Sequence, residues 1–202
     1  MFEHLANGLQ QLAPIPDEGM RSILAALQVK DVRKKSRLLS PGDDGNHMYF
    51  VNTGLFRYFV MDKEGNEQTT HLIPQNNWFG DARAFLSGEK TTIYIEAIED
   101  SQIFSISHEM INRFYDDVPY FERAVRKLIE HYFIKVLEKG KSSSYAGYTA
   151  QERYLSFLRA HPKLVNRVPA IYLASYLGTT PETLSRIRSQ YLRNPSMYES
   201  QR

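Results

Sequence analysis

The sequence between about Arg37 and Ser107 is built from short apolar or alternating runs, separated by clusters of turn-forming residues. The runs are Met48–Val51, Leu55–Met61, Thr69–Ile73, Thr92–Ile98 and Gln102–Ile106. Between two of them, Glu64-Gly65-Asn66 is typical of a hairpin turn. Many short strands at regular spacing predict an antiparallel β-barrel or β-roll.

Helices are expected on both sides of these strands. Ile23, Leu24 and Leu27 recur at helical spacing, which predicts a helix over about Asp17–Val29 with Asp17 as its N-cap. After the strands we expect a long helix, capped by Asp116 and Asp117 and with Pro119 in its first turn. Polar, small residues over 139–144 then predict a hinge.

The apolar stripe of the long helix is wider than packing on a single roll requires. Its residues recur at three- and four-residue steps: Phe121, Val125, Leu128, Ile129, Tyr132, Phe133, Val136 and Leu137. One side can lie on the roll while another meets a partner helix. A helix that packs wholly within its own chain is the alternative.

The composition describes a chain with an ordinary core: 42% of its residues are hydrophobic and 24% are charged. It contains no cysteine, which excludes disulfides, thiolate metal sites and cysteine-ligated iron–sulfur clusters. No stretch approaches the roughly 18 consecutive apolar residues of a membrane span, and the first residues do not resemble a secretory signal. We therefore expect a cytoplasmic protein with no membrane partner.

A helix-turn-helix is predicted at residues 170–188. The motif needs a small residue where the helices cross and, four residues later, one that accepts a positive φ; Ala174 and Gly178 meet these needs. Apolar side chains to fill the angle between the helices are present at Leu173, Leu177, Leu184 and Ile187. A capping box at Thr149-Ala150-Gln151-Glu152 predicts a preceding helix.

The second helix of the motif is the predicted DNA-contacting element. Thr180 can cap it and Pro181 favours its first position. Glu182, Ser185 and Arg186 share one face, where Arg186 can bind guanine and Glu182 can accept from a cytosine amino group. We expect Thr180, Thr183 and Arg188 to contact phosphates. A surface ion pair between Glu182 and Arg186, without DNA, is the alternative.

Charge is distributed unevenly along the chain. From Thr149 onward eight basic residues oppose three acidic ones, a formal net charge of +5, and the preceding residues carry −3. A basic C-terminal quarter on an acidic body is typical of a protein whose one end meets a polyanion.

The order of roll, long helix and helix-turn-helix resembles the Crp/Fnr family of bacterial transcription regulators. The most specific anchors are Leu38–Asp43, Met48–Gly54, Trp78–Asp81 and Glu182–Arg186. The resemblance implies an α+β fold with an N-terminal antiparallel, jelly-roll-like sensor roll (residues 1–116). A dimerisation helix and hinge (117–147) and a DNA-binding domain (148–202) would follow. It also implies a homodimer joined along the long helix, a two-fold operator with half-sites roughly 34 Å apart, and RNA polymerase as a further partner.

The family's cyclic-nucleotide cassette is altered here, over Phe79–Thr92. In nucleotide-binding members a Glu takes the ribose hydroxyl and an Arg pairs with the phosphate; here Asp81 and Thr91 stand at those positions, followed by Thr92. The expected effector pocket is formed by Gly80, Asp81, Ala82, Arg83, Thr91 and Thr92. Within it, Arg83 can replace the missing cation or pair with Asp81 and fill the pocket. We expect the second arrangement, no usual response to cyclic AMP, and an effector, if any, of another kind.

Two other functions compete with this interpretation. An enzyme of the cupin type would need clustered histidines, but the six present are scattered, at His4, His47, His71, His108, His131 and His161. We therefore expect no catalytic or metal site. The other alternative is a ligand-sensing or protein-docking module that does not bind DNA. A short tail after residue 188, without a clear pair of wing strands, is also expected.

Overall fold

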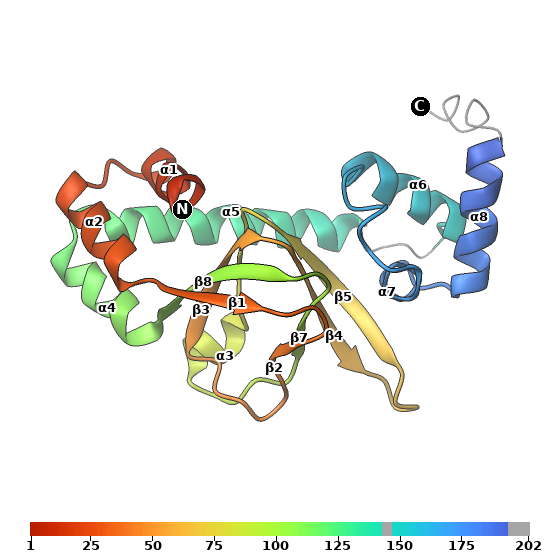
Figure 1. The fold of residues 1–202 in the computed structure, drawn as a ribbon, viewed down its shortest axis with the longest axis horizontal. Helices are drawn as coiled ribbons and strands as arrows, with labels where there is room; N and C mark the ends of the chain where they lie inside the picture. The colour runs from red at the N-terminus through yellow and green to blue at the C-terminus, as the bar shows by residue number, and fades with distance from the viewer. Residues whose placement is uncertain (143–146, 194–202) are drawn as a thin grey trace. The chain divides into compact units, whose positions relative to one another are not determined.

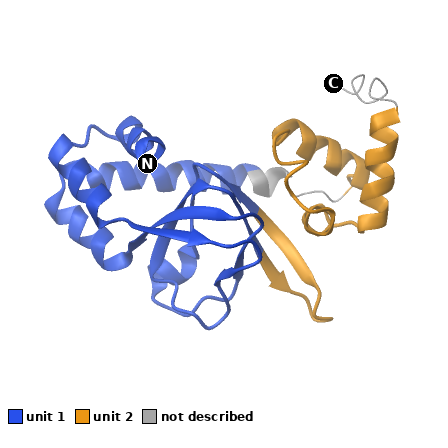
Figure 2. Ribbon diagram, viewed as in Figure 1, with its two compact units in different colours: residues 1–58, 72–139 blue, residues 59–71, 140–202 orange. Residues whose placement is uncertain are grey.

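The computed structural model describes residues 1–142 and 147–193 and confirms the expected α+β fold. By compactness the chain divides into two units, one of residues 1–58 and 72–139, the other of residues 59–71 and 140–202 (Figure 2). The tip of one hairpin is thus grouped with the C-terminal helices. Each unit is described by itself, and the domain boundaries expected at 116/117 and 147/148 stay predictions.

The roll is built from two four-stranded sheets (Figure 1). One has the order β1-β8-β3-β6 and the other β2-β7-β4-β5. The strands are β1 (Gln28–Val32), β2 (Arg37–Leu39), β3 (His47–Thr53), β4 (Leu55–Met61), β5 (Glu67–Pro74), β6 (Trp78–Phe79), β7 (Tyr94–Ala97) and β8 (Ser101–Ser107). The five strands expected from the apolar runs are therefore confirmed, with ends shifted by a few residues.

The interior of the roll is filled by aliphatic and aromatic side chains. Tyr49, Phe56 and Phe79 pack together, with ring centroids 5.3 Å apart for Tyr49–Phe79 and 4.8 Å for Phe56–Phe79. Val51 and Ile95 beside them are fully buried. The alternation of strand side chains sends this set inward, which is why the runs read as strands in the sequence.

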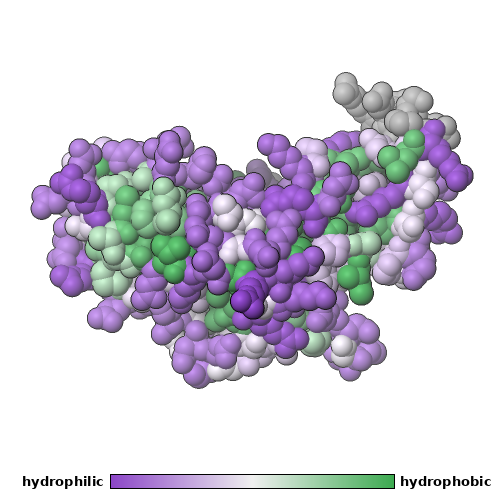
Figure 3. All heavy atoms as spheres, in the orientation of Figure 1, coloured by the Kyte–Doolittle hydropathy of each residue, from purple (hydrophilic) through white to green (hydrophobic). Residues whose placement is uncertain are grey.

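The helices of this unit are α1 (Glu3–Leu12), α2 (Asp17–Ala26), α3 (Ala82–Ser87), α4 (His108–Asp117) and α5 (Phe121–Ser142). On the face shown in Figure 3, apolar residues gather where Figure 1 draws α1, α2 and the first half of α5. The apolar side chains of α1, α2 and α4 pack on one face of the roll, around Phe50 and Phe104.

Three expected helix boundaries are wrong. The N-cap of α2 is Pro16 rather than Asp17, and the helix ends at Ala26 because Gln28–Val32 pairs with β8 as a strand. Asp116 and Asp117 do not cap the long helix: they end α4, whose own N-cap is Ser107. Pro119 lies before α5, not in its first turn, and α5 begins at Phe121.

The C-terminal helices are α6 (Ala150–Ala160), α7 (Ala170–Tyr176) and α8 (Pro181–Arg193). The capping box at Thr149 and Glu152 is confirmed, with both reciprocal hydrogen bonds present. No helix within residues 1–142 and 147–193 is both long and apolar enough to cross a membrane. The expected tail is partly covered by α8, which runs to Arg193; residues 194–202 lie outside the described part of the chain.

Candidate nucleic-acid interface and sensor site

The turn between α7 and α8 has the backbone that the sequence predicts. Gly178 has a φ of +61°, a conformation that costs a side-chain-bearing residue roughly 1 kcal/mol or more. The amide of Thr179 donates to the carbonyl of Ala174 at 2.9 Å, so the chain turns directly off the end of α7. Ala174 is 1% exposed, and Leu173 and Leu184 are fully buried beside it.

The first turn of α8 presents polar side chains to solvent. The Thr180 hydroxyl accepts from the amide of Thr183 at 3.2 Å, which confirms it as the cap. Pro181, Glu182, Ser185 and Arg186 are exposed, and Thr183 is half-buried. Hydrogen bonds from its own amide and the Thr180 hydroxyl lower the pKa of Glu182, so this acceptor stays ionised.

Arg188 lies against its own domain rather than freely in solvent. One Nη donates to the carbonyl of Val165 at 2.9 Å, and the guanidinium is 5.9 Å from the ring centre of Tyr154. These contacts join α8 to α6 and to the segment before α7. The phosphate contact expected of Arg188 stays a prediction, now for a side chain that already has a structural partner.

Arg153 is a residue of this site that the sequence analysis did not single out. Its guanidinium donates to the carbonyls of Leu177 (2.6 Å) and Gly178 (3.1 Å) in the turn, and to Tyr148 (2.7 Å). It therefore satisfies carbonyls that the end of α7 would otherwise leave unpaired. An arginine one turn into a capped helix gives no signal of this role in the sequence.

Ser175 in α7 joins the helix-turn-helix to the hairpin tip of the same unit. Its hydroxyl donates to the carbonyl of Glu67 at 2.8 Å and accepts from the amide of Thr69 at 2.9 Å. Strand β5 is an edge strand, so its outward amide and carbonyl need partners from outside the sheet. One hydroxyl supplies both.

Replacing Ser175 with alanine should expose this edge. We expect the Thr69 amide to lose protection, with hydrogen exchange at least about fivefold faster, because a hydrogen bond of this kind contributes about 1 kcal/mol. Amide exchange followed by NMR would measure it, with Ser189→Ala on exposed α8 as control. Unchanged exchange at Thr69 in Ser175→Ala would show that the contact does not persist in solution.

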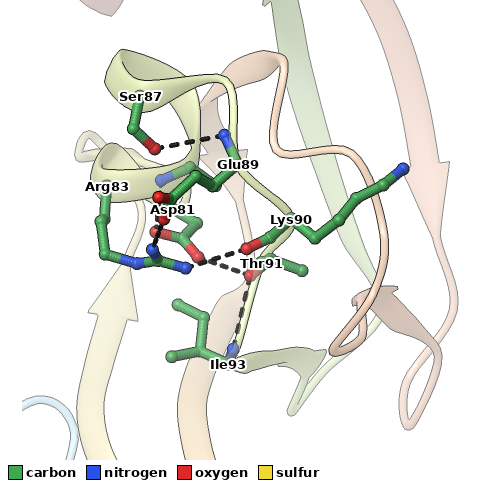
Figure 4. A network of polar contacts seen from close by, with 8 residues as sticks. Asp81, Arg83, Ser87, Glu89, Lys90, Thr91 and Ile93 are labelled. Atoms are coloured by element: carbon green, nitrogen blue, oxygen red, sulfur yellow. Dashed lines mark hydrogen bonds and ion pairs between the residues drawn. The ribbon is translucent and has the colours of Figure 1, made fainter.

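The cassette of the roll is closed on itself (Figure 4). The Thr91 hydroxyl donates to Asp81 Oδ2 at 2.5 Å, and Asp81 Oδ1 accepts from the amide of Ala84 at 3.1 Å as the N-cap of α3. Both residues are buried. The positions at which the ribose-binding Glu and phosphate-binding Arg were expected thus bond to each other.

The expected pairing of Arg83 with Asp81 is wrong. Arg83 instead forms an ion pair with Glu89 and donates to the carbonyl of Lys90 at 2.9 Å. Its side chain is 49% exposed, so it does not fill the pocket, and its guanidinium is held by Glu89 and by the carbonyl next to Thr91. The physical reason is that Thr91 already satisfies Asp81. Ala82 and Thr92 are also exposed, whereas Gly80 is buried.

Comparisons with known proteins show what this chain is similar to in sequence. Residues 29–117 match the family described as the cyclic nucleotide-binding domain. The fumarate and nitrate reduction regulatory protein of Vibrio cholerae is 22% identical over 186 residues, 80% of this chain and 68% of that protein. The cAMP-activated global transcriptional regulator CRP of Pasteurella multocida is 25% identical over 99 residues, 49% of this chain and 47% of that protein.

Among solved structures, FixK2 from Bradyrhizobium japonicum has the same fold, with a TM-score of 0.71 at 20% identity, covering 84% of this chain and 86% of that one. Roll, long helix and helix-turn-helix follow in the same order in such regulators. In its cyclic nucleotide-binding domain and in its fold, the chain is similar to the Crp/Fnr regulators. The resemblance proposed from its motifs is therefore confirmed.

The hydroxyl groups of two tyrosines form hydrogen bonds with the backbone next to the cassette. The Tyr58 hydroxyl accepts from the amide of Gly80 at 2.8 Å and donates to its carbonyl at 3.0 Å. Tyr132 in α5 accepts from the amide of Trp78 at 3.0 Å. Burial raises the pKa of both phenols, so both remain neutral donors and acceptors. Gly80 has a φ of +151° and lies against the His47 carbonyl, which leaves little room for a Cβ.

These contacts satisfy the backbone groups of Gly80 and Trp78 with hydrogen bonds to tyrosines of the same chain. Tyr58 is nearly buried in an apolar strand, and it belongs to none of the motifs that predicted the site. A polar aromatic residue inside an apolar strand run is the signal that could have drawn attention to it, because a buried hydroxyl needs a partner. The described residues contain no group of three or more His, Asp or Glu placed to hold a metal ion.

Proposed function

We propose that this chain is a homodimeric, sequence-specific DNA-binding transcription regulator, with α8 as the helix that enters the major groove. The observation that carries the proposal is the polar, exposed first half of α8. It stands on a turn whose carbonyls are already bonded within the domain by Arg153. Glu182, Ser185 and Arg186 therefore project from a corner whose shape is held by other residues.

Each exposed residue of this helix suits a different kind of contact. Arg186 offers two parallel donors, which match the O6 and N7 acceptors of guanine. Glu182, held ionised, can accept from a cytosine amino group. Thr180, Thr183 and the amides of the first turn suit phosphate oxygens, which fix the register without reading sequence.

The exposed face of α5 supports the dimer. Phe133 lies four residues after Ile129, and Val136 and Leu137 lie three and four residues after Phe133; the four are 56%, 61%, 61% and 51% exposed in chain order. An apolar stripe of this length is uncommon on a helix that faces only water. We propose that a second copy of α5 covers it, which would place two copies of α8 on a two-fold operator.

Arg186→Ala should relax base preference more than it weakens binding in general. We expect the ratio of operator to scrambled-DNA affinity to fall about 5- to 150-fold, because a bidentate contact to guanine contributes about 1–3 kcal/mol of discrimination. Fluorescence anisotropy at several salt concentrations, on an operator selected in vitro, would measure it. Arg193→Ala, an exposed arginine at the other end of α8, is the matched control and should leave the ratio unchanged.

The same titration tests the proposed function itself. Affinity should fall steeply as salt rises, because phosphate contacts release counterions. Failure to bind any duplex at low salt would favour a ligand-sensing or protein-docking module instead. Loss of affinity in Arg193→Ala equal to that in Arg186→Ala would place the specific contacts elsewhere.

We also propose that this regulator does not respond to cyclic AMP in the usual way. Thr91 stands where a cation would neutralise the phosphate, and it is already bonded to Asp81. Tyr58 occupies the backbone amide and carbonyl of Gly80. A nucleotide would therefore have to break three internal hydrogen bonds and would gain no ion pair.

Calorimetry with cyclic AMP and cyclic GMP should show no binding up to at least about 1 mM. A missing charge-assisted pair of this type costs roughly 1.5–3 kcal/mol, which is a tenfold to hundredfold loss before the internal bonds are counted. Micromolar binding of either nucleotide would contradict the proposal. Operator binding without any nucleotide is the accompanying expectation.

A further inference from the structure

An apolar cavity of about 130 Å³ lies in the unit that holds the roll, next to the cassette helix, and it opens to solvent beside Leu86 and Ile129, which are 73% and 56% exposed. Its walls come from α3 through Phe85, from α4 through Ile111 and Tyr115, and from α5 through Val125 and Leu128. Trp78 of β6 closes one side. It is distinct from the interior of the roll, which Tyr49, Phe56 and Phe79 fill with packed rings.

We propose that this cavity is a binding site for a small, uncharged or cationic molecule with an apolar body about the size of one benzene ring. Protein interiors are packed as densely as organic crystals, so an apolar space of this size is an unfilled site. A dry apolar cavity of roughly 150 Å³ is known to accept benzene or xenon, whereas water finds too few polar partners there. The volume here falls in that range.

The polar end of the ligand is assigned to the side of Tyr115. This residue is 37% exposed, so its hydroxyl can meet both solvent and a ligand group. Burial and the negative charge of Glu122 raise the pKa of Tyr115, which keeps the phenol neutral. A ligand carboxylate at this end would lie near like charge, and a hydroxyl or amine would not.

The size and depth of the cavity favour a small molecule over a second copy of the chain. Ile23, Ile106 and Ile111 in its wall are 1%, 3% and 8% exposed, so the space extends among core residues. A volume of one ring cannot admit a helix about 10 Å wide. A side chain of a partner copy could reach only the rim near Ile129.

The cavity lies next to the proposed dimer face, so a bound ligand could influence that face. Leu128 lines the cavity and its neighbour Ile129 belongs to the exposed stripe of α5. A ring between α4 and α5 would fix the side of α5 that lies on the roll. An effector role of this kind depends on the proposed function, whereas the binding site does not.

The only tryptophan of the chain, Trp78, lines the cavity and reports its occupancy. We expect toluene and benzylamine to change Trp78 fluorescence saturably, and benzoate to bind at least about tenfold more weakly. Val125→Phe should abolish the change by filling the cavity. Val29→Phe, the same substitution at a 43% exposed position of β1, should retain it.

Several results would overturn the site. One is the absence of saturable binding, and another is equal binding to Val125→Phe and wild type. A third is a fluorescence change that disappears as rising protein concentration drives dimer formation. That result would assign the space to a side chain of the partner copy. If Val125→Phe does not fold, as judged by circular dichroism, Ala82→Phe at the rim replaces it. Binding that leaves operator affinity within twofold would overturn the effector role and keep the site. Loss of DNA binding under all conditions would overturn only the proposed function.

Discussion

Glu96→Ala should lower the free energy of unfolding of the roll by about 3–5 kcal/mol, the largest stability effect expected for one substitution in this chain. Glu96 Oε1 accepts from Nε and Nη2 of Arg57, both at 2.9 Å. The side chains are 9% and 1% exposed. Removing the carboxylate takes the Glu96 ion pair away from a guanidinium that stays buried.

Urea denaturation followed by Trp78 fluorescence would measure the loss. The double variant Arg57→Leu/Glu96→Leu is the control, because it removes both charges and fills the space with apolar atoms. Replacing a buried pair in this way is often neutral or stabilising, so the double variant should be more stable than Glu96→Ala. A double variant less stable than the single one would show that Arg57 has a larger role than pairing with Glu96.

Phe133→Glu should separate the proposed dimer and abolish tight operator binding. Burying one phenylalanine contributes about 1.5–3 kcal/mol to the free energy of dimerisation, and a two-fold interface contains the residue from both copies. The dimer dissociation constant should therefore rise at least about 100-fold. Operator affinity should fall with it, because one copy of α8 reads only half a site.

Sedimentation at several protein concentrations would follow the dimer, and anisotropy would follow the operator. His131→Glu is the control: His131 is exposed on the same helix and lies two residues from Phe133, on the side of the helix opposite the stripe. It should leave the dimer largely intact. Equal effects of the two substitutions would mean that α5 does not pair along this stripe.

Features with local causes could be predicted from the sequence. The turn at Gly178, the cap at Thr180 and the capping box at Thr149 depend on residues within four positions of each other, and all are present. The strands of the roll were predictable because alternation in sequence becomes alternation of faces. Family resemblance extended these local results to the whole chain.

Features that depend on distant partners could not be predicted in this way. Thr91 and Asp81 bond across the cassette, and this bond left Arg83 to pair with Glu89. The helix expected over Asp17–Val29 overlaps the first two residues of strand β1, whose partner β8 is far away in sequence. The ion pair of Arg57 and Glu96 does have a signal in the sequence. Each is a charged residue within an apolar strand run, and two buried residues of opposite charge in one small core are expected to pair.

The three carbonyl contacts of Arg153 affect how the recognition element could be reused. The shape of the α7–α8 corner is held in part from outside the motif, by a side chain of α6. A segment cut at residue 170 and transplanted into another scaffold would keep Gly178 and lose this brace. Engineering a new operator preference on this chain should therefore exchange residues on the surface of α8, with α6 carried along as part of the same module.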